Sequence, residues 1–219
     1  KSFTGTPTND NVGSLNIKIT AIDPAGNTAS DVFKLTVTNV NDAPQMVSGA
    51  VTSTTAVEFG AVSVNVAAAF TDVDVGDVLT FSSSNLPTGW TLTAAGQLSG
   101  TAPINTTNAT AQQTISITAT DKAGATKTTD FTLNVTNDTT APAKVTAVLQ
   151  SDNGTSTSDG ITSNGTVLVS GVEANAMWQY TINGGTTWAL GSGTSFVLPV
   201  AKYASGDVQV RQMDQAGNF

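Results

Sequence analysis

The stretch "ITATDKAGATKTTDFTLNV", residues 117–135, decides the fold. Apolar and polar side chains alternate on both sides of an Asp-x-Ala-Gly segment, which predicts two β-strands joined by a tight turn. A period of two places the apolar side chains of each strand on one face of the hairpin. A lone hairpin is marginally stable in water, so this one requires further strands to cover its apolar face.

The same pattern occurs twice more along the chain. "ITAIDPAGN" (19–27) and "VRQMDQAGN" (210–218) also end an alternating run with an aspartate and place Ala-Gly two residues later. The three aspartates, Asp23, Asp121 and Asp214, follow one another at intervals of 98 and then 93 residues. A period of this length indicates an array of similar domains.

Composition favours an all-β chain. Of the 219 residues, 39% are hydrophobic and 11% are charged, which is too apolar for a disordered segment and enough for sizeable cores. The nearest approach to a helical pattern is "VNVAAAF" (64–70), whose apolar residues alternate, so we predict a strand there too. We expect antiparallel β-sandwiches with no helix longer than three turns.

The acidic residues restrict the possible functions. The chain has no cysteine and no histidine, which excludes thiolate zinc sites, cysteine nucleophiles and the commonest general base, so we do not expect an enzyme. Any metal must be bound by oxygen atoms. The net charge of −8 disfavours binding to nucleic acid, and no apolar run predicts insertion into a membrane.

Two proline-containing segments, "TNVNDAP" (38–44) and "TNDTTAP" (136–142), predict domain boundaries, because proline interrupts strand pairing. We expect three parts. Residues 1–42 are the C-terminal part of an incomplete repeat, residues 43–138 a complete sandwich, and residues 139–219 a sandwich lacking its last strand. The chain is then a piece of a tandem array, whose open edges could exchange strands with another copy.

The aromatic residues of the third part leave two interpretations. Trp178, Tyr180 and Trp188 flank an Asn-Gly-Gly turn, which is typical of a hairpin. They could form a platform for stacking sugars, but tryptophan at alternate strand positions belongs more often to a core. We interpret these three residues, and Trp90 in the second part, as core residues.

Several segments of the second part together resemble a cadherin-like domain of the dystroglycan type. They are "NVNDAP" (39–44), "FTDVDVGDVLTF" (70–81), "LPTGWTLTAAGQLSGTAP" (86–103) and "ITATDKAG" (117–124). Residues 1–42 resemble the second half of another copy. The third part, with "SDGITSNGTVLVSG" (158–171) and "WQYTINGGTTW" (178–188), is similar to a bacterial immunoglobulin-like repeat. Such repeats occur in tandem in large RTX-type bacterial surface adhesins.

The resemblance implies Ca²⁺ at the junctions between domains. This ion takes six to eight oxygen ligands and tolerates irregular geometry, so carboxylates from separate segments can bind it. At the first junction the resemblance implies the linker residues Asn39, Asn41 and Asp42, the pair Asp72 and Asp74, the helper Asp77, and the strand-end residue Asp121. The acidic cluster that animal cadherins carry is replaced here by "SGTAP" (99–103), so we expect fewer ions per junction, about one or two.

At the second junction the implied ligands are Asn137, Asp138, Asp152, Asp159 and Asp214. Glu58 resembles the cadherin glutamate that reaches the junction after its own domain. Asp23 would belong to a site that is incomplete in this sequence.

These observations favour a structural role. Binding sites need to occur once, whereas spacers recur, so we expect a Ca²⁺-rigidified extender of a bacterial cell-surface adhesin. It would hold distal binding domains away from the cell in adhesion and biofilm formation, with neighbouring repeats of the same long chain as its partners. The alternative is a module of the same kind of adhesin that binds a carbohydrate or another surface.

Overall fold

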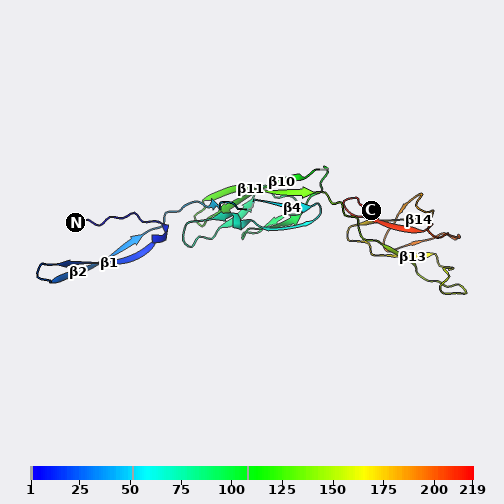
Figure 1. The fold of residues 1–219 in the computed structure, drawn as a ribbon, viewed down its shortest axis with the longest axis horizontal. Helices are drawn as coiled ribbons and strands as arrows, with labels where there is room; N and C mark the ends of the chain where they lie inside the picture. The colour runs from blue at the N-terminus through cyan, green and yellow to red at the C-terminus, as the bar shows by residue number, and fades with distance from the viewer. Residues whose placement is uncertain (1, 51, 108) are drawn as a thin grey trace. The chain divides into compact units, whose positions relative to one another are not determined.

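The computed structural model describes residues 2–50, 52–107 and 109–219, and it is built almost entirely of strands (Figure 1). The prediction of an all-β fold is confirmed. The helices of the described residues are two short 3₁₀ segments, Asn9–Asn11 and Val66–Ala69. Neither is long and apolar enough to span a membrane.

The chain divides into two compact units. The first consists of residues 1–56, 61–101 and 112–134, and the second of residues 57–60, 102–111 and 135–219. The strands are β1 (Gly13–Ile22), β2 (Thr28–Val37), β3 (Gln45–Met46), β4 (Ser53–Val57), β5 (Ala61–Asn65), β6 (Phe70–Thr71), β7 (Thr80–Ser83), β8 (Thr91–Leu92), β9 (Gln97–Thr101), β10 (Ala111–Thr120), β11 (Thr126–Thr136), β12 (Thr146–Leu149), β13 (Thr166–Ser170), β14 (Met177–Thr181), β15 (Ala189–Leu190), β16 (Ser195–Val197) and β17 (Gln209–Met213).

The first unit begins with the hairpin β1–β2, as predicted from the alternation of its residues. The two strands pair antiparallel from Gly13 opposite Val37 to Ile22 opposite Thr28. Most hairpin residues are exposed, including Leu15 at 61% and Ile19 at 55%. The hairpin therefore does not bury a core of its own.

The predicted sandwich follows the hairpin. Its sheets have the strand orders β4-β11-β10-β7 and β5-β9-β8, with a further short pair, β3-β6. Ile117 of β10 and Leu133 of β11 are fully buried, and so is Leu98 of β9. Trp90 is 7% exposed and donates its indole N–H to the carbonyl of Thr101 at 2.9 Å, so its predicted core position is confirmed.

The predicted strand at 64–70 is wrong over its middle. Strand β5 ends at Asn65, and Val66–Ala69 form a 3₁₀ turn before β6 begins at Phe70. The side-chain oxygen of Asn65 accepts the backbone N–H of Ala67 at 3.0 Å. Asparagine at such a position satisfies a backbone donor of the turn, which competes with continued strand pairing.

The second unit contains the sheets β12-β13-β16 and β15-β14-β17. Trp178 is 4% exposed and packs in a core with Phe196, against which the ring of Tyr180 stacks at a centroid distance of 4.1 Å. Trp188 is only half-buried, and the guanidinium of Arg211 lies 4.0 Å from its ring centroid. The core prediction is thus confirmed for Trp178 and wrong for Trp188, because Trp188 precedes β15 and has no inward strand position.

Candidate metal centre

The three Asp-x-Ala-Gly segments form the same turn. In each, Oδ1 of the aspartate accepts the backbone N–H of the fourth residue after it, at 2.8 Å from Asn27, 2.8 Å from Ala125 and 2.9 Å from Asn218. The glycine of each turn has a positive φ, between 90° and 95°, which favours glycine. Each repeated aspartate therefore closes its own turn as well as placing a carboxylate at the strand end.

The second oxygen of each aspartate accepts a side-chain amide N–H, which comes from within the turn in two cases and from the linker in the third. Asn27 and Asn218 each donate their side-chain N–H to the aspartate of their own turn, at 2.8 and 2.9 Å. The middle turn has Ala125 at that position. There Asn41, from the predicted linker, donates its side-chain N–H to Oδ2 of Asp121 at 2.8 Å.

These hydrogen bonds favour the ionised carboxylates. The side-chain N–H of Asn41 is the largest cause that lowers the pKa of Asp121, and Asn27 has the same effect on the pKa of Asp23. For Asp214, burial opposes ionisation, but the side-chain and backbone N–H groups of Asn218 outweigh it, so that pKa is also lowered. All three strand ends carry a negative charge at neutral pH.

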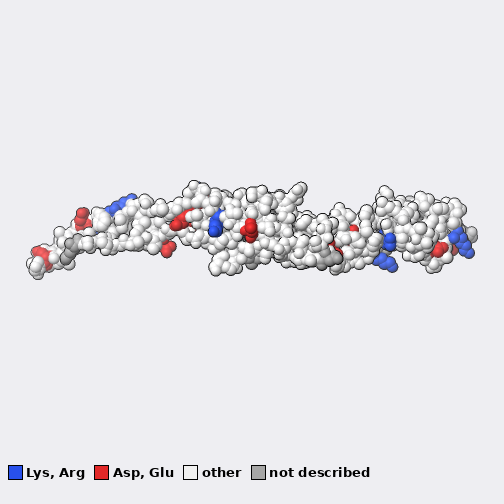
Figure 2. All heavy atoms as spheres, turned by 90° about the horizontal axis from the view of Figure 1, so that it is seen from above, with Lys and Arg blue, Asp and Glu red and all other residues white. Residues whose placement is uncertain are grey.

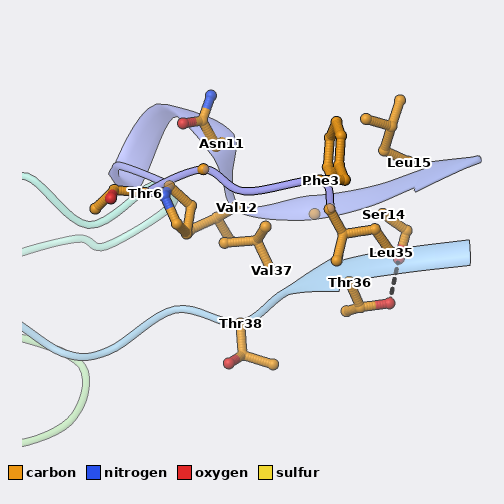
Figure 3. Close-up of a pocket in the computed structure, with 13 residues that line it drawn as sticks. Phe3, Thr6, Asn11, Val12, Ser14, Leu15, Leu35, Thr36, Val37 and Thr38 are labelled. Atoms are coloured by element: carbon orange, nitrogen blue, oxygen red, sulfur yellow. Dashed lines mark hydrogen bonds between the residues drawn. The ribbon is translucent and has the colours of Figure 1, made fainter. Parts of the chain in front are cut away.

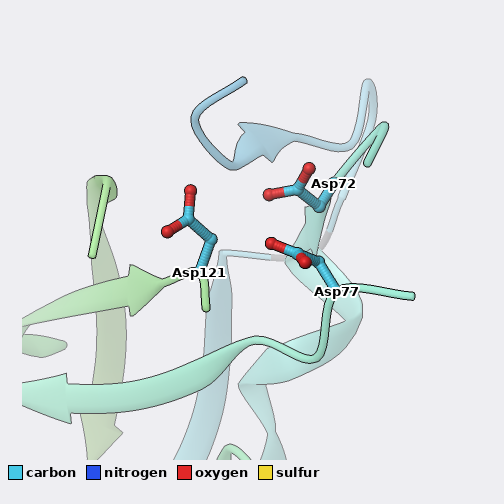
Figure 4. A group of neighbouring side chains, drawn as sticks. All are labelled: Asp72, Asp77 and Asp121. Carbon is cyan, nitrogen blue, oxygen red and sulfur yellow. The ribbon is translucent and has the colours of Figure 1, made fainter. Parts of the chain in front are cut away.

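Three carboxylates converge at one end of the sandwich in the first unit. Asp72, Asp77 and Asp121 each offer an oxygen, and these three atoms lie within 4.8 Å of one another. Asp72 directly follows β6, Asp77 lies farther along the same loop before β7, and Asp121 directly follows β10. In Figure 4, the carboxylates of Asp72 and Asp77 point toward the side on which Asp121 lies. Within the described ranges, no other three acidic residues come together in this way. On the face drawn in Figure 2, the acidic side chains (red) are scattered among other residues.

Two carboxylate oxygens at this place are buried and unpaired. Asp74 is 5% exposed, and its Oδ2 accepts the backbone N–H of Asp42 at 2.7 Å. Its Oδ1 is buried without a hydrogen-bond partner among the described residues, as is Oδ2 of Asp72. Buried polar atoms without partners are costly and rare, so these oxygens fit a site for a cation.

The linker contributes to this cluster unequally. Asn41 and Asp42 reach the aspartates through the hydrogen bonds described above, and Oδ2 of Asp42 also accepts the side-chain N–H of Asn9 at 3.1 Å. Asn39 is exposed. The structure thus gathers Asn41 and Asp42 with the aspartates, while ligation by any of these residues stays a prediction.

A second set of predicted ligands lies in the second unit. Glu58 is 6% exposed, and its two oxygens accept the backbone N–H groups of Asp138 at 3.0 Å and Asn105 at 2.9 Å. Asn218 donates its side-chain N–H both to the carbonyl of Asp138, at 3.1 Å, and to Asp214. Glu58, Asp138 and Asp214 are therefore linked by hydrogen bonds, and the half-buried Asn137 adjoins them in sequence.

Sequence reasoning missed Asn105 and Asn218 in this second set. Asn218 had a readable signal, because it occupies the same position after Ala-Gly as Asn27 does in the first turn. Asn105 had none. Its side-chain N–H donates to the carbonyl of Val135 at 3.0 Å, a contact that depends on the folded sandwich.

Asp152 and Asp159 do not join this set. Strand β12 separates Asp138 from the loop 150–160 along the chain. Each of the two carboxylates accepts a backbone N–H within that region, from Gly160 at 2.8 Å and from Ile161 at 3.0 Å. They belong to a separate loop.

The donor set of the first cluster suits a hard cation. Every candidate ligand is a carboxylate or amide oxygen, which is the set that Ca²⁺ and Mg²⁺ prefer. The ligands come from the linker, from the loop after β6 and from the turn after β10. An irregular site of this kind suits the flexible coordination of Ca²⁺ better than the strict octahedron of Mg²⁺.

The fold defines a class of tandem antiparallel β-sandwich proteins, and the comparisons with known proteins agree. Residues 1–38 and 43–136 match the family described as "Putative Ig domain" (He_PIG). These two stretches make up more than half of the chain, which therefore belongs to this family. The break between them falls within the first predicted linker. No curated protein matches the chain.

Solved structures of cadherin domains are similar to this chain. PcdhgB3 EC1-4 is 14% identical, with 80% of this chain and 45% of that chain covered, at a TM-score of 0.48. Protocadherin gamma B7 extracellular cadherin domains 1-4 are 16% identical, with 93% and 54% covered, at 0.44. Mouse protocadherin-24 EC1-3 is 13% identical, with 96% and 77% covered, at 0.40. The chain spans about half the length of the first two structures.

Proposed function

We propose that this chain is a non-catalytic, Ca²⁺-stiffened structural segment of a long extracellular bacterial adhesin of the RTX type. The convergence of Asp72, Asp77 and Asp121, beside two buried carboxylate oxygens without partners, carries the proposal. The recurrence of the same strand-end aspartate along the chain supports a mechanical role, because a spacer repeats its joints.

The residues of the first cluster would hold the ion and transmit its effect. Without a cation, the like charges of the three carboxylates repel one another. With Ca²⁺ bound, that repulsion is removed, and Asn41 and Asp42 connect the linker to the same cluster. An ion that binds only the ordered arrangement stabilises it by about 2.7 kcal/mol when its free concentration is a hundred times its dissociation constant.

Glu58, Asp138 and Asp214 are proposed ligands of a second, weaker site. Both oxygens of Glu58 already accept backbone N–H groups, and no cluster of three close carboxylates forms there among the described residues. In this second set, hydrogen bonds already hold Glu58, Asp138 and Asp214 together without an ion. Ca²⁺ at the millimolar concentrations found outside cells fills even weak sites, which suits a protein at the bacterial surface that mediates adhesion and biofilm formation.

The alternative, a module that binds carbohydrate, lacks an open aromatic platform among the predicted residues. Trp178 is buried, and the guanidinium of Arg211 covers the ring of Trp188. We therefore favour the structural role.

Calorimetric titration with Ca²⁺ tests the metal site, with Mg²⁺ as the competing ion. We expect Ca²⁺ to bind more tightly than Mg²⁺, and the double variant Asp72→Asn/Asp77→Asn to lose the tightest Ca²⁺ site. Asp10→Asn, a change at an exposed residue outside the cluster, is the matched control. Equal Ca²⁺ affinity in the double variant and the control would overturn the assignment.

The stiffening role needs its own measurement. Small-angle scattering with Ca²⁺ and with chelator should show a narrower distribution of dimensions when Ca²⁺ is bound. If Ca²⁺ binds but neither the scattering profile nor the melting temperature changes, the site exists and the mechanical proposal is wrong.

A further inference from the structure

The hairpin β1–β2 repeats the buried core of the sandwich residue by residue. At a constant offset of 98 positions, six residues on one face of the hairpin are identical to six core residues of β10 and β11. The hairpin residues are Ile17, Ile19, Ala21, Phe33, Leu35 and Val37, and their counterparts are Ile115, Ile117, Ala119, Phe131, Leu133 and Val135.

The burial of the two sets is opposite. Phe33 is 41% exposed, whereas Phe131 is 2% exposed, and Leu35 is 38% exposed, whereas Leu133 is fully buried. Burying the part of these apolar side chains that is still exposed would be favourable, because apolar surface is then removed from water. A contiguous apolar face of this kind marks a binding surface, and the identical residues in the sandwich show which cover fits it.

The segment before the hairpin already provides part of this cover. "FTGTP" (3–7) corresponds to "LSGTAP" (98–103), which places Phe3 at the position of Leu98 in β9. Leu98 is fully buried. Phe3 is 74% exposed and lies beside Leu15 above the hairpin, where both line an open pocket of about 760 Å³ (Figure 3).

In the sandwich, the rest of the cover comes from the residues between the linker and β9. These residues include the buried Val62 and Trp90, and they form the strands β5 and β8, which pair with β9 in one sheet. No charged residue lies among the six apolar positions of the hairpin face. A polar ligand bound there would lose its hydrogen bonds to water without gaining new ones. The occupant must supply a second apolar sheet face.

We propose that the apolar face of the β1–β2 hairpin docks a half-sandwich with the sequence pattern of residues 43–95, joined in front of the hairpin on the same polypeptide. Phe3 then enters the core as Leu98 does, and the hairpin becomes the second half of a sandwich like the one at 43–136. This inference is independent of the metal site.

The first experiment adds a second copy of residues 43–95 directly before Lys1 of the full chain. Phe3 then stands at the same distance behind the added segment as Leu98 stands behind the original one. We expect amide hydrogens of β1 and β2 to exchange at least about 100-fold more slowly than in the chain without the extension. Unchanged exchange, or an extension that stays unfolded, would overturn the proposal.

Paired variants show whether protection depends on the proposed face. In the extended protein, Phe33→Asp should abolish the added protection. Val32→Asp is the matched control, because Val32 is 56% exposed on the other face and its counterpart in the sandwich is the exposed Asp130. Equal loss in both variants would contradict the assignment of the face.

A second construction tests the same fit inside the existing sandwich. Residues 17–37 replace residues 115–135, an exchange of equal length that keeps all six core residues. We expect the chimera to fold and to melt within about 5 °C of the original, a shift that corresponds to about 1–2 kcal/mol in a unit of this size. A chimera that fails to fold would show that the hairpin does not fit this cover.

A second copy of the chain is the competing occupant. If the unextended chain forms dimers at micromolar concentration that protect the hairpin, and Phe33→Asp dissociates them, then the face belongs to self-association. That result would also overturn the proposal.

Discussion

The side-chain N–H of Asn41 donates to Oδ2 of Asp121 at 2.8 Å, although the two residues are 80 positions apart in the chain. In the other two turns, the corresponding amide comes from inside the turn, from Asn27 and Asn218. The linker of the first cluster is therefore tethered to the strand end before any cation binds. Repulsion between the carboxylates alone would predict a flexible linker in the metal-free protein, and the hydrogen bond from Asn41 opposes that effect.

We expect Asn41→Ala to raise the pKa of Asp121 toward its ordinary value of 3.8, because this amide is the largest cause that lowers it. Titration of the Asp121 carboxyl carbon by NMR in the metal-free protein measures the change. Asn39→Ala, at an exposed neighbour, should leave that pKa unchanged. Adding Ala125→Asn should lower it again, since the turn then regains the amide that Asn27 supplies in the first turn. A pKa unaffected by Asn41→Ala would refute this account.

The three turn aspartates predict weaker folding in acid. Their pKa values are lower in the folded protein than the ordinary 3.8, so the folded state binds fewer protons than the unfolded state as the pH falls. Their stabilisation is fully present above the unfolded pKa and is lost as the pH drops through the folded values. Melting temperatures measured in chelator between about pH 6 and pH 2 should fall less for Asp121→Asn than for the wild type. A steeper fall in the variant would contradict the sign.

Alternation and turn residues were sufficient to predict the hairpin β1–β2, the sandwich and the lack of long helices among the described residues. They could not predict Val66–Ala69, because "VNVAAAF" alternates and the 3₁₀ turn depends on a local hydrogen bond from Asn65. They also could not predict that Trp188 stacks on Arg211, since that contact joins residues far apart in the chain.

The candidate metal centre was predictable in part. The spacing of Asp72 and Asp74 and the repeat of Asp121 indicated which carboxylates to consider. Asp77, expected only as a helper, belongs to the closest trio, whereas Asp74 turns one oxygen to the backbone of Asp42. The direction of each carboxylate depends on loop geometry, which a pattern of residue types does not encode.

Identical residues on the two hairpins predict unequal mutational effects. Leu133→Ala should destabilise the first unit by about 2–5 kcal/mol, because it leaves a cavity in a closed core. Leu35→Ala, at the equivalent but 38% exposed position, should cost less than about 1 kcal/mol. Chemical unfolding followed by hydrogen exchange in β10 and β1 separates the two effects. Equal costs would mean that the hairpin face is covered in the isolated chain.

Two glycines make room for tryptophan rings and should resist even the smallest side chain. A Cβ at Gly100 would lie 2.3 Å from a ring carbon of Trp90, and a Cβ at Gly191 would lie 2.3 Å from one of Trp178. We expect Gly100→Ala and Gly191→Ala each to destabilise their unit by about 1–3 kcal/mol through overpacking. Gly5→Ala, where a Cβ meets no atom within 4 Å, is the control. Tryptophan fluorescence during urea unfolding reports the change, and wild-type midpoints in both variants would rule out the close packing.

Asp72 and Asp121 should respond in opposite ways when the metal is removed. Asp72 has a buried oxygen without a partner, so Asp72→Asn removes a repelling charge and keeps an oxygen that can accept the backbone N–H of Asp74. We expect this variant, in chelator, to melt at or above the wild-type temperature. Asp121→Asn weakens the hydrogen bonds that close the turn and hold Asn41, and it should melt lower.

In saturating Ca²⁺, both variants should melt below the wild type, because each lacks a proposed ligand. Differential scanning calorimetry in the two conditions gives all the comparisons. If Asp72→Asn lowers the melting temperature equally with and without Ca²⁺, then its carboxylate acts in folding and not in binding the ion.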